Sequence, residues 1–280
     1  MSGSTPKTYG SLLDTATRLL GSKFDAGQLF THVTQKKLYH MSFLSEKPVP
    51  EQQADLLLRM VHRRLAGEPL QYLLGEWEFY SLPFKVGKGV LIPRAETEVV
   101  VDAALDLLKD MKSPVILDLC SGTGCVAISI SHNRPDALIT AVEVSDTAYD
   151  YLLQNIELNR SKVEPVKQDL KEYKHPCQLD MLVSNPPYIP KETIATLQPE
   201  LKFEPRLALS GGGDGLDFYR IIPRLYFDQL LPGGWFCLEI GIGQSKQVVK
   251  ILEESGCSDV FVRDDYAKIP RVVCARKPEA

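Results

Sequence analysis

The sequence predicts an α/β fold in which a mostly parallel sheet is covered by helices and preceded by a small helical bundle. Apolar residues recur at helical spacing through residues 8–70. From Glu96 onward, short apolar runs alternate with amphipathic helical segments, the pattern of a parallel sheet with helices on both faces. The chain has 280 residues, 44% of them hydrophobic, enough for one large domain or for a medium and a small one.

The first part of the chain predicts helices without a catalytic cluster. "YGSLLDTATRLL" places five apolar residues on one face, namely Leu12, Leu13, Ala16, Leu19 and Leu20. "AGQLFTHVTQKKLYHMSF" (residues 26–43) repeats this spacing. "PVPEQQADLLLRMVHRRLAG" (residues 48–67) begins with prolines, which suit a helix N-terminus, and ends at Gly67, a suitable C-cap. We therefore expect a helical domain over residues 1–72.

Residues 73–92 differ from this helical part. They are rich in aromatic and β-branched residues and are interrupted by glycine and proline. This composition predicts a short β-hairpin that links the helical domain to a second domain over residues 93–280.

The second domain alternates predicted strands and helices. The predicted strands cover residues 114–120, 137–144, 163–169, 179–185 and 233–242, with a terminal pair at 259–266 and 271–276. The predicted helices cover residues 125–133, 145–159, 216–231 and 244–255. Ser145 is the expected N-cap of the second of these helices, and Pro223 is expected to kink the third.

Composition excludes several classes of protein. The net charge is −4, with about +3 in residues 1–75 and about −7 in the rest, too weak a basic bias for a protein that grips nucleic-acid phosphates. The six cysteines form no C-x-x-C pair, which favours reduced core thiols in a cytoplasmic protein. Three histidines near the N-terminus lack metal-ligand spacing. We expect no signal peptide and no membrane segment, because no apolar run reaches about 20 residues.

A candidate cofactor loop follows the first predicted strand. In "DLCSGTGC", Asp118 ends the strand, and Gly122 and Gly124 allow a sharp turn and close approach of a ligand. Glu143 ends the next strand, where a carboxylate can accept hydrogen bonds from ribose hydroxyls. The loop lacks the third glycine of a dinucleotide fingerprint and the lysine of a triphosphate loop. It therefore favours a nucleoside without pyrophosphate, such as S-adenosylmethionine; a strand–helix turn that needs small residues is the structural alternative.

Asp169 closes the third predicted strand. Its position is compatible with a turn cap and with recognition of an adenine amino group, and the sequence leaves both open.

The fourth predicted strand ends in Asn-Pro-Pro-Tyr, residues 185–188. An amide nitrogen is a poor nucleophile, so its two N–H groups must be held while its lone pair faces an electrophile. The Asn185 side-chain oxygen and the Pro186 carbonyl can act as the two acceptors, and proline fixes its own φ. Tyr188 offers a flat face to a planar amide or base. An ordinary strand-ending turn is the alternative.

These motifs together resemble the Class I S-adenosylmethionine-dependent methyltransferases that act on amino groups. "AGEPLQYLLGEWEFYSLPFKV", "GVLIPRAETE", "SNPPYIP", "FEPRLALSGGGDGLDFYR" and "LPGGWFCLEIG" resemble, in order, segments of the release-factor glutamine N5-methyltransferase family (PrmC/HemK). The resemblance implies a Rossmann-like, seven-stranded, mostly parallel sheet. It also implies N5-methylation of the glutamine in the GGQ motif of peptide-chain release factors, with the helical domain docking the factor.

The resemblance assigns roles to particular positions. It implies catalytic roles for Asn185, Pro186 and Tyr188. It implies cofactor binding by Cys120, Ser121, Gly122, Thr123, Gly124, Glu143, Asp169, Leu170 and Asn185. It implies substrate binding by Asn185, Pro186, Pro187, Tyr188, Arg94, Phe203 and Glu204. The implied product is S-adenosylhomocysteine. We expect no metal, no direct nucleic-acid partner and a cytoplasmic monomer.

The chain departs from the family at three positions. Cys120 stands where the family usually has glycine, Glu143 where it often has aspartate, and Lys268 where glycine is frequent. "SGGGDG" (residues 210–215) resembles a phosphate loop only superficially, because it lacks the lysine. Two other functions stay open at this point: a DNA adenine N6-methyltransferase, disfavoured by the charge, and a non-enzymatic adapter, disfavoured by the intact motifs.

Overall fold

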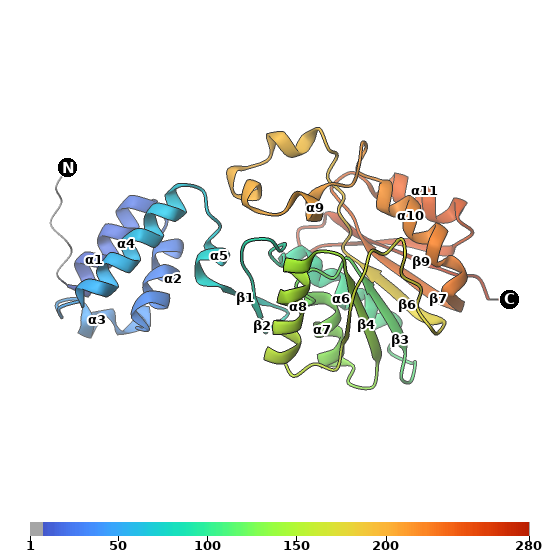
Figure 1. Cartoon of the computed structure of the whole chain (residues 1–280), viewed down its shortest axis with the longest axis horizontal. Helices are drawn as coiled ribbons and strands as arrows, with labels where there is room; N and C mark the ends of the chain where they lie inside the picture. The colour runs from blue at the N-terminus through green and yellow to red at the C-terminus, as the bar shows by residue number, and fades with distance from the viewer. Residues whose placement is uncertain (1–7, 280) are drawn as a thin grey trace. The chain divides into compact units, whose positions relative to one another are not determined.

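The computed structural model describes residues 8–279, so the outermost residues of the two predicted domains, 1–7 and 280, lie outside the described part. The chain divides between Glu76 and Trp77 into two compact units (Figure 1).

The first unit is built from short helices. They are α1 (Tyr9–Leu20), α2 (Lys23–Thr34), η1 (Leu38–His40), α3 (Met41–Leu44), α4 (Glu51–Leu65) and α5 (Leu70–Leu74). Thr8 begins α1 with a capping box, in which its side chain accepts from Ser11 N and the Ser11 side chain accepts from Thr8 N. The core includes Leu12, Phe30 and Leu57, all fully buried.

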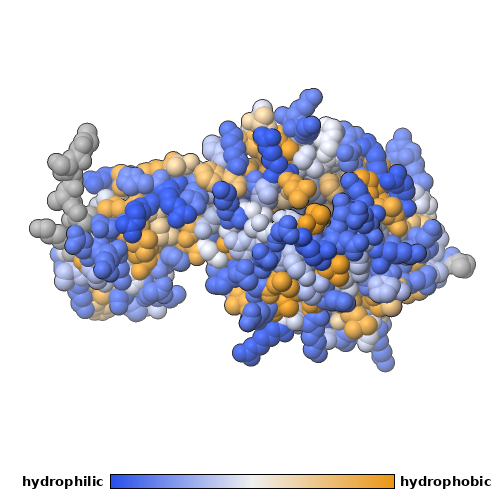
Figure 2. Space-filling view, in the orientation of Figure 1, coloured by the Kyte–Doolittle hydropathy of each residue, from blue (hydrophilic) through white to orange (hydrophobic). Residues whose placement is uncertain are grey.

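Two predictions in this unit were wrong in detail. Leu19, expected on the buried face of α1, is 40% exposed. The helical spacing predicted over residues 26–43 is broken after Thr34, because Gln35 adopts a left-handed φ of 56° and ends α2. Apolar side chains remain exposed here, among them Phe24, Tyr39 and Phe43, and Figure 2 shows apolar patches among the polar surface of this unit.

The second unit contains a seven-stranded sheet. Its strands are β3 (Val115–Leu119), β4 (Leu138–Glu143), β5 (Glu164–Lys167), β6 (Leu179–Ser184), β7 (Leu230–Glu239), β8 (Ser258–Asp264) and β9 (Pro270–Arg276). The strand order is β5-β4-β3-β6-β7-β9-β8. The strands from β5 to β7 pair in parallel, and β9 pairs antiparallel with both β7 and β8. The predicted mostly parallel sheet is therefore confirmed.

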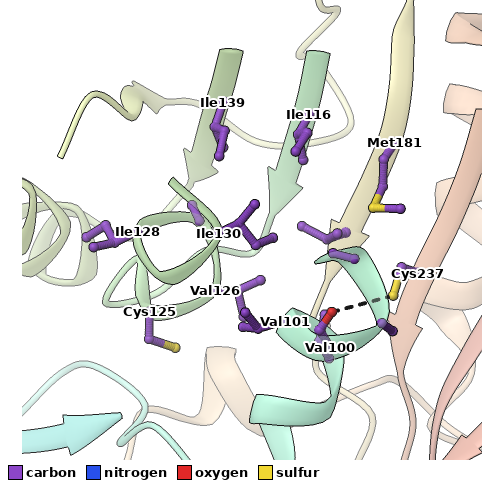
Figure 3. Close-up of a cluster of buried hydrophobic side chains, with 14 of the residues drawn as sticks. Val100, Val101, Ile116, Cys125, Val126, Ile128, Ile130, Ile139, Met181 and Cys237 are labelled. Atoms are coloured by element: carbon purple, nitrogen blue, oxygen red, sulfur yellow. Dashed lines mark hydrogen bonds between the residues drawn. The ribbon is translucent and has the colours of Figure 1, made fainter. Parts of the chain in front are cut away.

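Helices cover both faces of this sheet (Figure 1). One face packs against α6 (Glu98–Leu107), α7 (Cys125–Asn133) and α8 (Asp146–Leu158), and the other against α10 (Asp217–Tyr226) and α11 (Ser245–Glu254). Figure 3 shows the first core, where side chains of α6 and α7 meet Ile116, Ile139 and Met181 of the strands. Near-continuous apolar strands follow from this two-sided burial.

The predicted hairpin forms from β1 (Glu76–Phe79) and β2 (Leu82–Lys85). Phe79 and Phe84 belong to the core of the second unit. The fully buried Asn155 of α8 also holds the hairpin: its Oδ1 accepts from Lys85 N at 2.6 Å, and its Nδ2 donates to Lys85 O at 3.1 Å and to Thr123 O at 3.0 Å. One amide side chain thus ties the hairpin to the candidate cofactor loop.

Other elements agree with the sequence or extend it. Ser145 caps α8 by accepting from Ala148 N, as predicted. Helix α10 continues through Pro223 to Tyr226 and is followed by η5 (Phe227–Gln229). Helix α6, which η2 (Ala95–Thr97) precedes, was not predicted. Nor were the short helices η3 (Thr193–Thr196), η4 (Pro199–Phe203) and α9 (Arg206–Leu209).

The six cysteines are all free, as predicted, but they are not all core residues. Cys125, Cys237 and Cys274 are buried, whereas Cys177 is exposed because it lies in the turn before β6. Within residues 8–279, no helix is long and apolar enough to span a membrane.

Candidate active site

A cleft lies at the carboxyl ends of β3, β4 and β6, where ligands bind in open α/β sheets. The structure brings most of the predicted site residues to this cleft. Those in its lining are Arg94, Cys120, Ser121, Gly122, Thr123, Glu143, Asp169, Leu170, Asn185 and Pro187. Five predicted residues are absent from the lining, namely Gly124, Pro186, Tyr188, Phe203 and Glu204.

The loop after β3 makes its turn with left-handed backbone. Gly122 and Gly124 have φ of 55° and 78°, and Cys120 has φ of 58°. A Cβ placed on Gly122 would meet no atom within 4 Å, so no other protein atom fills the space beside this residue. Asp118 accepts from Ala127 N at 3.3 Å and so caps the first turn of α7; burial raises its pKa to about 8.

Glu143 joins this loop to the start of α8. Its Oε2 accepts from Gly122 N at 2.8 Å, and its Oε1 accepts from Ser145 N at 2.7 Å. The side chain is buried, and burial raises its pKa against the opposing effect of these backbone donors. Each carboxylate oxygen keeps a further lone pair, so a ligand hydroxyl in the cleft can still donate to it.

Asp169 serves as a turn cap, one of the two roles that the sequence left open. Its Oδ1 accepts from Lys171 N at 2.8 Å. It also lines the cleft, so recognition of a ligand by the same carboxylate stays compatible with the geometry.

Asn185 is oriented by a residue that sequence reasoning missed. Its Nδ2 donates to the Thr97 hydroxyl oxygen at 3.1 Å, and Thr97 is 2% exposed. Because the NH₂ end of the Asn185 amide is engaged, the Oδ1 end is the one left to accept from a ligand. Thr97 lies in "IPRAETE", where nothing in the sequence marks it as a partner of Asn185.

Tyr188 does not line the cleft; its hydroxyl donates to Glu239 Oε1 at 3.4 Å. Burial raises the pKa of this phenol above its ordinary value. Its expected contact with a planar substrate therefore stays a prediction.

The glycine-rich segment 210–215 supports the Asn-Pro-Pro-Tyr backbone. A Cβ on Gly211 would come within 2.7 Å of Pro187 O and of Tyr188 Cα, and one on Gly215 within 2.4 Å of Tyr188 O. Gln244 Nε2 donates to Tyr188 O at 2.9 Å. Close backbone packing therefore accounts for Gly211 and Gly215 without a bound phosphate.

Arg94 and Glu204 form an ion pair beside the cleft. Glu204 Oε2 also accepts from Ile92 N at 3.1 Å, and its side chain is 1% exposed. Glu204 therefore fixes the backbone at Ile92 and pairs with Arg94. The neighbouring Pro205, Leu207 and Ala208 line the cleft, whereas Phe203 is 37% exposed. No group of three or more His, Cys, Asp or Glu within residues 8–279 could hold a metal ion.

Comparison with known proteins gives two family matches. The Methyltransferase small domain matches residues 97–213, and the PrmC N-terminal domain matches residues 11–75. Among solved structures, the hMettl16 catalytic domain in complex with an RNA hairpin has a TM-score of 0.58 at 16% identity, over 80% of this chain and 81% of that one, which shows the shared fold alone.

Curated relatives are more similar in sequence. A release factor glutamine methyltransferase from Thermodesulfovibrio yellowstonii is 39% identical over 91% of this chain and 93% of its own. One from Fusobacterium nucleatum subsp. nucleatum is 36% identical over 90% of this chain and 73% of its own. With such identity over most of both chains, the protein belongs to the release factor glutamine methyltransferase family.

Proposed function

We propose that this protein transfers a methyl group from S-adenosylmethionine to the side-chain amide nitrogen, N5, of the glutamine in the GGQ motif of peptide-chain release factors. Family membership supports the reaction and its substrate. The observation that carries the chemistry is the orientation of Asn185, whose amide N–H is bound by Thr97 and whose oxygen is thereby left as an acceptor beside the cleft.

The cleft suits the cofactor. The Gly122 turn leaves its wall open, and the buried Glu143 carboxylate stands at the end of the adjacent strand, where it can accept from ribose hydroxyls. Asp169 and Leu170 complete the wall on the β5 side and are suited to hold the base. The bound cofactor supplies an electrophilic methyl group on a positively charged sulfonium, and S-adenosylhomocysteine is the product.

The residues of this chain position the glutamine amide of the substrate. A glutamine amide has two N–H donors, and Asn185 Oδ1 and the Pro186 carbonyl are two fixed acceptors for them. Holding both donors defines the plane of the amide and the direction of its nitrogen lone pair. Such preorganisation can supply about 7–11 kcal/mol of the barrier reduction in favourable cases. No strong base is needed for it, and we infer no role for a metal.

We further propose that the first unit docks the release factor, and that the protein acts in the cytoplasm as a monomer. The match of residues 11–75 to the PrmC N-terminal domain supports a separate role for this unit. The free cysteines suit a reducing compartment.

Transfer of labelled methyl tests the function. Purified protein incubated with labelled S-adenosylmethionine should label a release factor, and changing the glutamine of that factor's GGQ motif should abolish the label. Labelled DNA together with an unlabelled release factor would overturn the assignment in favour of a DNA adenine methyltransferase.

A further inference from the structure

Glu239, at the end of β7, is a buried carboxyl group without a direct part in the proposed methyl transfer. It is 1% exposed. In the parallel pairing of β6 with β7, Ser184 lies beside Leu238, so the chain positions that follow are Asn185 and Glu239. The sheet therefore brings this acid next to the residue that we assign to the substrate amide.

The contacts of Glu239 lead to the Asn-Pro-Pro-Tyr segment by two routes. Its Oε1 accepts from the Tyr188 hydroxyl at 3.4 Å. On the other route, the Thr97 hydroxyl lies close enough to the same carboxyl group to lower its pKa. The Thr97 oxygen already accepts from Asn185 Nδ2 at 3.1 Å, so its own hydrogen is free to point at the acid.

The second carboxylate oxygen of Glu239, Oε2, is able to accept a hydrogen bond from the Thr97 hydroxyl. Glu239 Oε2 is buried and has no hydrogen-bond partner among the residues that the structure describes. A buried carboxylate oxygen without a donor is costly, so such groups in native proteins call for an explanation. An acceptor reserved for the Thr97 hydroxyl accounts for it.

We propose that Glu239 is a positioning residue for methyl transfer, which holds Thr97 and Tyr188 and thereby fixes the Asn185 amide and the Pro186 backbone. The inference rests on the proposed function. In its ionised form the acid can only accept, so the Thr97 hydrogen points toward it and the Thr97 oxygen faces Asn185. A protonated acid can instead donate to the Thr97 oxygen, so the Thr97 hydroxyl is no longer held in one orientation toward Asn185.

The charged surroundings of Glu239 keep both forms accessible near neutral pH. Burial raises its pKa to about 7, and the charge of Glu96 acts in the same direction. Arg271 of β9 lowers the pKa and is itself held by Asp265. The hydroxyl groups of Tyr188 and Tyr219 and the Cys125 thiol also lie near this residue. Tyr219 donates to the Glu239 backbone carbonyl at 2.8 Å.

The test uses Glu239→Gln in the full chain, with Glu157→Gln on the exposed face of α8 as the matched control. We expect Glu239→Gln to lower kcat for release-factor methylation by about tenfold or more, because small displacements of a positioned group cost one to two orders of magnitude in rate. KM for S-adenosylmethionine should stay unchanged. The wild-type and control rates should rise with pH through about 7, while the Glu239→Gln rate loses this rise.

Thr97 provides an independent variant if Glu239→Gln is poorly folded. Thr97→Val should lose a similar part of the rate, Thr97→Ser should restore most of it, and the two losses should not add in Glu239→Gln/Thr97→Val. The inference would be overturned if Glu239→Gln had the kcat and the pH profile of the wild type. Additive losses of rate in the double variant would overturn it as well. A wild-type enzyme that fails to label the release factor would instead refute the proposed function.

Discussion

Cys120 shows what one side chain imposes on the cofactor loop. Its φ of 58° lies in the left-handed region, where a residue with a Cβ costs roughly 1–2 kcal/mol. The family resemblance places glycine here, and the structure keeps the glycine-like backbone in spite of the cysteine. Cys120 lines the cleft, and burial raises the pKa of its thiol.

We predict that Cys120→Val destabilises the protein by about 1–2 kcal/mol, because a β-branched residue tolerates positive φ poorly. Cys120→Gly should stay within about 1 kcal/mol of the wild type, because relief of strain offsets the greater freedom of glycine in the unfolded chain. Urea denaturation of both variants measures this. Equal stability of the valine and glycine variants would show that the loop carries no backbone strain.

At the scale of single residues, the sequence predicted groups whose role is local. Glu143 and Asn185 each end a strand, and a strand end can be located from the apolar run before it. Thr97 and Glu239 could not be predicted, because Thr97 meets Asn185 across 88 positions and Glu239 meets Tyr188 across 51. The contact of the Tyr188 ring with a substrate stays a prediction, and its hydroxyl donates to Glu239, a partner that the pairing of β6 with β7 brings close.

Among the elements, the glycine-rich segment 210–215 has a role that the sequence did not predict. It resembles a phosphate loop only superficially, and in the structure Gly211 and Gly215 lie against the Pro187 and Tyr188 backbone. Gln244, at the start of α11, completes this support. The backbone of Pro187 and Tyr188 is therefore supported by a segment more than 20 residues away in the chain.

A matched glycine pair tests this dependence. Gly211→Ala should abolish most methylation and cost on the order of 1–3 kcal/mol, because its Cβ would overlap three backbone atoms at 2.7 Å. Gly213→Ala should be nearly neutral, since a Cβ there meets nothing within 4 Å. Kinetics and thermal melting of the pair are the measurement. Similar activity in the two variants would contradict a supporting role for the segment.

Regular elements were the most predictable part of the fold. The boundaries of α7 agree with the prediction, and those of α8 and β6 agree closely, because a sustained apolar period and a capping residue fix them. The short helices η3, η4 and α9 were missed, since pieces of four or five residues carry no measurable period. The sheet order could not be obtained from the sequence either, because strands of similar composition do not specify their neighbours.

Over the whole molecule, buried acids couple stability to pH. Burial raises the pKa of Asp118 from its ordinary value of 3.8 to about 8. The folded state therefore binds this proton more tightly than the unfolded state, and the contribution of Asp118 to stability falls as pH rises from about 4 to about 8.

We expect Asp118→Asn, which keeps an acceptor for Ala127 N, to gain stability relative to the wild type as pH rises. The gain between pH 5 and 8 should be on the order of 2–4 kcal/mol, at about 1.4 kcal/mol per pKa unit. Urea unfolding at several pH values gives the difference. A wild-type-minus-variant difference that does not change with pH would show that the acid titrates normally.

We expect cofactor binding and release-factor docking to be separable between the two units. Every residue that lines the cleft lies at or beyond Gly89. A chain without residues 1–75 should therefore bind S-adenosylmethionine with unchanged affinity, while KM for the intact release factor rises at least tenfold, as expected when a docking contact of about 1.4 kcal/mol or more is lost. Calorimetry and methylation kinetics measure the two quantities. An unchanged KM would exclude docking by the first unit.

The contacts of Asn155 make opening of the cofactor loop detectable at the hairpin. Its amide joins the Lys85 N–H of the hairpin to the Thr123 carbonyl of the cofactor loop. Opening of that loop would release Asn155 and expose the Lys85 amide to solvent. Deuterium uptake at this one hairpin position should therefore slow when the cleft is filled, although the hairpin itself holds no cofactor.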